Sequence, residues 1–135
     1  MRIKEKIDEI NALINELDEI IPANVKGYKN DNKTKAACER YFERVVEAVI
    51  DLAFLTIKDN KYKIPEEDKQ AFDTLVEMNV ISKDLGERLK EAKGMRNILA
   101  HEYGKVDDEL IFESITKEIK NDVNEFLNSV KELLD

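Results

Sequence analysis

The chain has 135 residues, of which 39% are charged and only 7% aromatic, and its formal net charge is −8. Its single cysteine, Cys38, excludes an intramolecular disulfide, and no apolar run approaches the roughly 18 residues that span a membrane. This composition favours one helical domain over residues 1–135, with a cytoplasmic location as the default expectation, and disfavours a protein that simply coats nucleic acid.

The first two predicted helices follow from the spacing of apolar residues. Isoleucine and leucine recur every three or four positions along residues 3–21, which is the stripe of an amphipathic helix, and Pro22 ends it. A polar loop follows. Residues 34–57 are predicted as a second helix, and because nearly every position from 45 to 57 is apolar, this half should lie in the core.

Three further helices complete the prediction. Pro65 and the acidic residues after it suit a first helical turn, so a shorter third helix is expected to begin there. Ser82 is the predicted N-cap of a fourth helix that ends near Gly104, and Asp107 is the predicted cap of a fifth. Because no alternating strand pattern is present, the chain is predicted to be all-α, an antiparallel helical bundle of four to five helices.

The fourth predicted helix carries the only histidine of the chain in the octet Arg-Asn-Ile-Leu-Ala-His-Glu-Tyr, residues 96–103. Arginine can hold a phosphate through two parallel hydrogen bonds, which lysine cannot do, and histidine exchanges protons near neutral pH. Arg96, Asn97 and His101 are therefore candidate catalytic residues for cleavage of a phosphodiester. Residues 86–106 hold five basic and three acidic side chains, which permits a local RNA groove on an acidic protein.

The octet, with the spacing R-x-x-x-x-H-x-Y and Asn after the Arg, resembles the signature of the HEPN superfamily, in particular its HepT-like RNase toxins. Residues 47–53, 72–81 and 103–107 are also similar to segments of that family. The resemblance implies a metal-independent ribonuclease toxin of a type VII-like toxin–antitoxin pair, acting on RNA as a homodimer with a cleft between two motif helices. It further implies a MntA-like nucleotidyltransferase antitoxin as partner, which silences the toxin by AMP transfer to the motif tyrosine, Tyr103.

Helical geometry limits how these side chains can meet. At about 100° per residue, Arg96 falls on the apolar side of its helix and needs an anionic partner there. Asp51 and Glu47 are the candidate supporting acids; Asp51 lies at a boundary where it either orients the site or faces solvent. His101 lies about 140° around the helix from Arg96, so a second copy facing the first would complete the site. Gly94, on the His101 side, can serve close approach by a helix or a ligand.

Simpler interpretations exist for each residue. Arg96 can form an ordinary ion pair with Asp51 or Glu47, His101 can stabilise a helix C-terminus, and Tyr103 can be an amphipathic anchor. At the level of the protein, the alternatives are a non-catalytic substrate-binding subunit of a nucleotidyltransferase and a purely structural helical oligomer. No cluster with metal-ligand spacing and no Gly-rich phosphate loop is present in the sequence, so no metal or other cofactor is expected.

Overall fold

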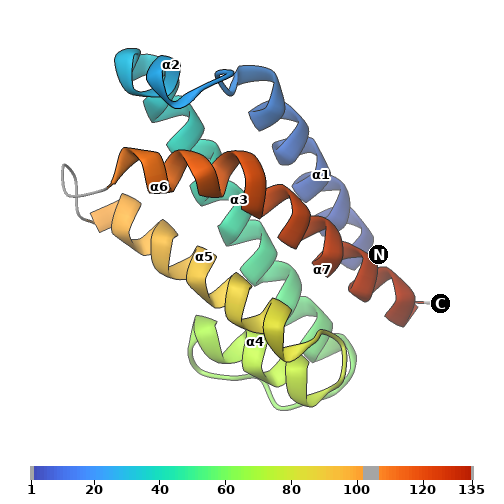
Figure 1. The fold of residues 1–135 in the computed structure, drawn as a ribbon. Coiled ribbons are helices and arrows are strands. Elements are labelled where there is room, and N and C mark those ends of the chain that lie inside the picture. Colours follow the sequence, from blue (N-terminus) through green and yellow to red (C-terminus); the bar gives the residue numbers. More distant parts are fainter. Residues whose placement is uncertain (1, 102–106, 135) are drawn as a thin grey trace.

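The computed structural model describes residues 2–101 and 107–134, and every regular element within these ranges is helical. In chain order the elements are α1 (Arg2–Ile20), α2 (Val25–Asn30), α3 (Asn32–Asp59), α4 (Asp68–Glu77), α5 (Lys83–His101), α6 (Asp108–Glu113), the π-helical segment η1 (Ser114–Glu118) and α7 (Ile119–Leu134). The long helices α1, α3, α5 and α7 run alternately up and down (Figure 1), which confirms the predicted all-α fold and antiparallel bundle. Within the described ranges, no helix combines the length and apolar character that crossing a membrane requires.

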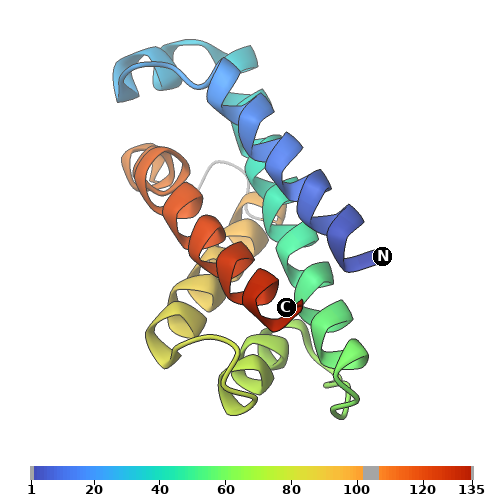
Figure 2. The same cartoon turned by 90° about the vertical axis from the view of Figure 1, so that its right-hand side faces the viewer.

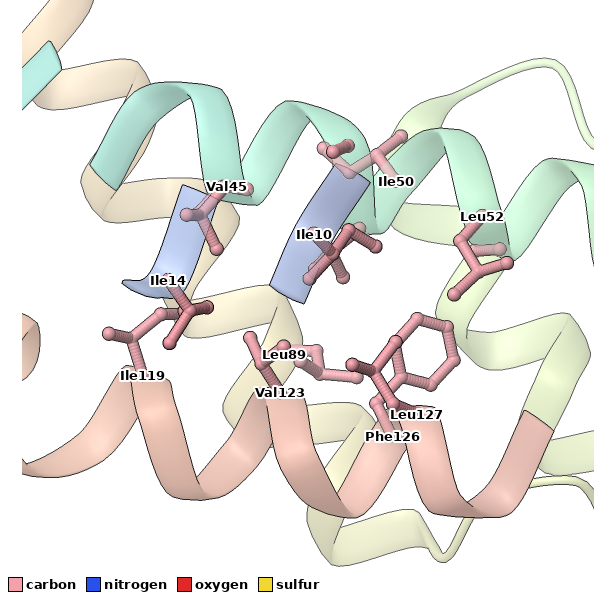
Figure 3. Close-up of a cluster of buried hydrophobic side chains, with 14 of the residues drawn as sticks. Ile10, Ile14, Val45, Ile50, Leu52, Leu89, Ile119, Val123, Phe126 and Leu127 are labelled. Atoms are coloured by element: carbon pink, nitrogen blue, oxygen red, sulfur yellow. The ribbon is translucent and has the colours of Figure 1, made fainter. Parts of the chain in front are cut away.

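Helix α3 lies at the centre of the bundle. It contacts α1, α2, α4 and α5, and its apolar second half is buried as predicted. Figure 3 shows how the four long helices share one core, with Ile10 of α1, Leu52 of α3, Leu89 of α5 and Phe126 of α7 gathered together, each at most 1% exposed. Helices α1 and α7 also meet directly, since Lys120 of α7 donates a 2.7 Å hydrogen bond to Asp18 of α1, and Figure 2 shows both helices in front of α3. Burial of such side chains is the main force that holds the helices together.

Two helix starts are capped as the sequence predicts. Ser82 Oγ accepts a hydrogen bond of 3.0 Å from the backbone N–H of Leu85 and so caps α5. Asp107 Oδ1 accepts bonds of 3.0 and 3.3 Å from the N–H groups of Glu109 and Leu110 at the start of α6. Each cap satisfies N–H groups that have no partner inside the helix, and the first one fixes where the motif helix begins.

The polar loop predicted after α1 contains a short helix, α2, which the sequence did not indicate. Asn24 caps it by accepting a 2.9 Å hydrogen bond from the N–H of Gly27. Tyr28 is fully buried, lies 5.3 Å from the ring of Phe112, and donates a 2.8 Å hydrogen bond to Glu39. Helix α2 is too short to be stable alone, so tertiary packing of one tyrosine accounts for it.

Two other elements differ in detail from the prediction. Helix α4 begins at Asp68 rather than at Pro65. Just before it, the backbone N–H of Glu67 donates a 3.4 Å hydrogen bond to the side chain of Gln70. The predicted fifth helix is α6 and α7 joined through the π-helical segment Ser114–Glu118. Such a segment carries one extra residue in a turn. The spacing of apolar residues in the sequence does not indicate it.

Helices α4 and α5 lie unusually close together at Gly86. A Cβ atom on Gly86 would stand 2.8 Å from Cγ2 of Val76, which is closer than real side chains come. Helix α4 also buries Ala71, Phe72 and Leu75 against the bundle. The missing side chain at Gly86 therefore allows Val76 of α4 to pack directly against α5.

Candidate active site

Helix α5 positions the described part of the octet. Arg96 and Asn97 are half-buried and His101 is exposed in the last turn of the helix. Tyr103 and the expected helix end at Gly104 belong to residues 102–106, outside the described residues. The structure thus places three of the four candidate side chains on one helix, with Arg96 facing inward and His101 facing outward.

The environment of Arg96 is the most unusual feature of the site. Its side chain is only 18% exposed, yet its nearest carboxylate oxygen among the described residues, Oδ2 of Asp68, lies 3.9 Å from Nη2. That distance exceeds a hydrogen bond. The Nε atom is buried and has no hydrogen-bond partner in the described part of the chain. A buried guanidinium normally has its donors satisfied, so the described residues leave the guanidinium of Arg96 incompletely satisfied.

The acids expected beside Arg96 have other surroundings. Asp51 is exposed, and its carboxylate accepts a 3.4 Å hydrogen bond from Lys6 of α1. Glu47 is half-buried, and no ion pair links either acid to Arg96 within the described residues. The partner found instead is Asp68, which the sequence suggested only as an acid suited to a first helical turn. No local signal could have identified it, because the contact depends on how α4 packs across α5.

His101 belongs to an exposed ridge along α5. Gly94, Ile98 and His101 lie on nearly the same side of an ideal helix. A Cβ atom added to Gly94 would meet nothing within 4 Å, and Ile98 is 43% exposed. The described residues of this chain therefore make no close approach to Gly94. An open glycine and an exposed apolar side chain next to His101 leave this face free for another molecule.

A groove of about 480 Å³ lies between α5 and the α6–η1–α7 segment. Ala92 and Met95 of α5 form part of its wall, and Leu110 and Ile119 lie across from them. Its charged lining consists of Arg88, Lys117, Glu91, Glu118 and Asp122. Because carboxylates are in excess, this groove is a poor place for an RNA phosphate, and Arg96 is the better anchor.

Metal ligands do not gather in the described structure: within residues 2–101 and 107–134, no group of three or more His, Cys, Asp or Glu side chains could hold a metal ion. The chemistry available at the described site is therefore that of a guanidinium, an amide and an imidazole on one helix. These groups can bind a phosphate, orient it and move a proton.

Comparison with known proteins places these observations in context. A family model described as "Ribonuclease HepT-like" matches residues 10–130. A protein of Archaeoglobus fulgidus named "Putative RNase" is 29% identical over 136 aligned positions, covering 99% of this chain and 94% of the relative. The "mRNA nuclease HepT" of Shewanella oneidensis is 24% identical, covering 96% of each chain.

Solved structures agree with the fold. A tri-AMPylated HEPN toxin of Shewanella oneidensis in complex with MNT antitoxin superposes with a TM-score of 0.88 at 24% identity and covers 96% of each chain. A cytosolic protein of unknown function from Bacillus subtilis, YutE, superposes with a TM-score of 0.81 at 16% identity, over 98% of this chain and 88% of that one.

Proposed function

Because the chain belongs to the Ribonuclease HepT-like family, we propose that it is a ribonuclease toxin that cleaves RNA through Arg96 and His101. The observation that carries the proposal is the half-buried Arg96, whose Nε has no partner and whose nearest carboxylate is 3.9 Å away among the described residues. Relatives named as an RNase and as an mRNA nuclease support the substrate class. A purely structural helix would have little reason to bury a cation so incompletely satisfied.

The proposed mechanism needs no metal. The RNA 2′-hydroxyl attacks the adjacent phosphorus, the 5′-oxygen leaves, and the product carries a 2′,3′-cyclic phosphate. His101 takes the proton of the attacking hydroxyl and a proton is returned to the departing 5′-oxygen, while Arg96 offsets the charge that gathers on the phosphoryl oxygens. Asn97 orients the phosphate or the imidazole, and Asp51 and Glu47 act from further away as supporting acids. DNA lacks the 2′-hydroxyl and is not a substrate.

The active unit in this proposal is a homodimer. Arg96 faces inward and His101 outward on the same helix, so one chain does not present both to one phosphate. A two-fold axis near the ridge of Gly94 and Ile98 brings a second α5 against the first and supplies the missing group. Light scattering should give the mass of a dimer at micromolar concentration, and a monomer there contradicts this assembly.

Control by a partner is the last part of the proposal. The solved toxin that resembles this chain is tri-AMPylated and bound to MNT antitoxin, which supports a nucleotidyltransferase antitoxin here. Tyr103 is the proposed acceptor, two residues after His101 in the sequence. AMP on this residue would set a negative charge against RNA phosphate. Co-expression with the cognate transferase should add one or more AMP masses on Tyr103, and a Tyr103→Phe chain that is still fully neutralised argues for steric masking instead.

Incubation of the purified protein with total RNA in EDTA tests the enzyme directly. We expect cleavage in EDTA, with products ending in 2′,3′-cyclic phosphate. His101→Ala should lower the rate on the order of 100-fold because proton transfer is lost, while circular dichroism shows an unchanged helical content. A His101→Ala protein that cleaves like the parent contradicts the catalytic assignment and favours a non-catalytic substrate-binding subunit of a nucleotidyltransferase.

A further inference from the structure

We propose that Asp68 is a positioning residue for Arg96: a displaceable counter-ion that holds the guanidinium until an RNA phosphate takes its place. The inference rests on the proposed function, because it concerns how Arg96 meets its phosphate. It adds a residue from a different helix, α4, to a site that otherwise lies on α5.

The geometry of the pair is that of a loose contact. Nη2 of Arg96 lies 3.9 Å from Oδ2 of Asp68, beyond hydrogen-bond distance. The arginine side chain is 18% exposed and the aspartate side chain 48%. The cation is therefore held inside the protein, whereas its counter-ion stands at the surface and can turn toward water. Such a contact balances charge without occupying the donors of the guanidinium.

The long distance between Arg96 and Asp68 is not explained by a wide separation of α4 from α5. Asp73, further along α4, meets Lys90 of α5 at 2.8 Å, a direct hydrogen-bonded ion pair. The same two helices also come into very close contact at Gly86. Helix α4 is therefore firmly docked, and the gap between Asp68 and Arg96 belongs to that pair alone.

The position of Asp68 is fixed by its helix. It is the first residue of α4, where a carboxylate is favoured by the helix dipole. The bond from the N–H of Glu67 to the Gln70 side chain holds the turn just before it. The carboxylate thus stays near Arg96 without a hydrogen bond to it. A counter-ion that a phosphate displaces needs this arrangement.

Binding of RNA then becomes an exchange of anions. The phosphate offers several acceptor oxygens to donors that Asp68 leaves unused. The two anions repel each other beside the same guanidinium, so the carboxylate opposes phosphate binding as long as it remains. Removal of the charge at position 68 should tighten RNA binding, and a longer side chain that reaches the guanidinium directly should weaken it.

A short fluorescein-labelled 2′-O-methyl RNA, which cannot be cleaved, measures this exchange by fluorescence anisotropy. We expect Asp68→Asn to lower Kd about threefold, the scale of a partly exposed ion pair, and Asp68→Glu to raise it. Asp73→Asn is the matched control, because it removes the same charge from an acid of the same helix that also pairs with α5. It should leave Kd within error of the parent. Thermal unfolding of each variant verifies that it is folded.

The decisive comparison repeats Asp68→Asn in an Arg96→Ala chain. In that chain Asp68→Asn should have no effect on Kd, because Asp68 is proposed to influence RNA binding through Arg96. Equal tightening in both backgrounds, or by Asp73→Asn, means a general charge effect and overturns the role of Asp68. Unchanged or weaker binding by Asp68→Asn overturns it as well. If Arg96→Ala itself leaves Kd unchanged, the phosphate-binding assignment of Arg96 is wrong, and the inference about Asp68 fails with it.

Discussion

Helix α5 contains the sequence Gly-x-Arg twice, at residues 86–88 and 94–96, and the two copies have opposite surroundings. Arg88 is 34% exposed and meets three carboxylates: Asp84 at 3.1 Å, Glu125 at 3.2 Å, and Asp122 in the shortest contact of the three. Arg96 is only 18% exposed and, within residues 2–101 and 107–134, has one carboxylate nearby, at 3.9 Å. The more buried arginine is the less satisfied one, which is the reverse of what stability alone would produce.

The glycines repeat the contrast. Gly86 is packed so tightly that a Cβ atom would collide with Val76, whereas Gly94 has nothing within 4 Å. One end of α5 therefore packs tightly into the bundle, whereas at the other end the described residues leave Arg96 Nε without a partner and Gly94 without a close neighbour. The comparison teaches that the same local sequence can serve stability or binding, depending on what the neighbouring helices bring to it.

The largest test of this contrast exchanges the two arginines for alanine. Arg96→Ala should reduce RNA cleavage by about 100-fold or more, because the phosphoryl charge loses its cation, while the free energy of unfolding changes by less than about 1 kcal/mol. Arg88→Ala should keep the chemistry but lower stability by about 2–3 kcal/mol, because Asp122 is left buried and unpaired. Cleavage assays and urea denaturation on both variants measure these opposite effects on activity and on stability. Equal loss of activity in both, at matched folding, breaks the comparison.

The pH dependence of the stability of Arg88→Ala tests the structural role of Arg88. Burial raises the pKa of Asp122 above its ordinary value, while the hydrogen bond from Arg88 acts in the opposite direction. Without Arg88 the pKa rises further, so the folded state binds this proton more tightly than the unfolded state, and stability increases as the pH falls. The stability deficit of Arg88→Ala should therefore shrink from pH 7 to about pH 5. Urea denaturation of parent and variant at both pH values measures it, and a deficit that grows on acidification contradicts the assignment.

The smallest effects come from the paired glycines. At concentrations low enough to keep the chain monomeric, Gly94→Ala should stabilise the fold by about 1 kcal/mol, because alanine favours a helix and the new methyl group meets nothing among the described residues of its own chain. Gly86→Ala gains the same helix propensity, but its methyl group must displace Val76, so a net loss of about 1 kcal/mol is expected. Chemical denaturation of the two variants should therefore give shifts of opposite sign, and shifts of the same sign would show that the two ends of α5 do not differ in packing.

Much of the molecule could be predicted from its sequence because the relevant signals are local. Apolar spacing located α1 and α3, and Ser82 and Asp107 were identified as caps from their chemistry and position. The octet was assigned to a helix with Arg96 on its apolar side, which agrees with the burial of that residue.

The remaining features depend on contacts between distant segments. Helix α2 exists because Tyr28 packs on Phe112 and bonds Glu39, and the π-helical segment Ser114–Glu118 interrupts a stripe that looked continuous. The acid expected beside Arg96 is on α3, whereas the nearest one among the described residues, Asp68, lies on α4. Apolar periodicity indicates which face of a helix is buried, but not which end of a neighbouring helix will cross it.

The contact at Gly86 has a consequence for how this protein can vary. A side chain at position 86 would press on Val76 of α4, and α4 carries Asp68, the proposed counter-ion of Arg96, in its first turn. A substitution ten residues from Arg96 in the sequence could thus alter the charge balance of the site without touching it. Gly86 therefore bears on the site through the packing of α4, although it takes no part in the chemistry.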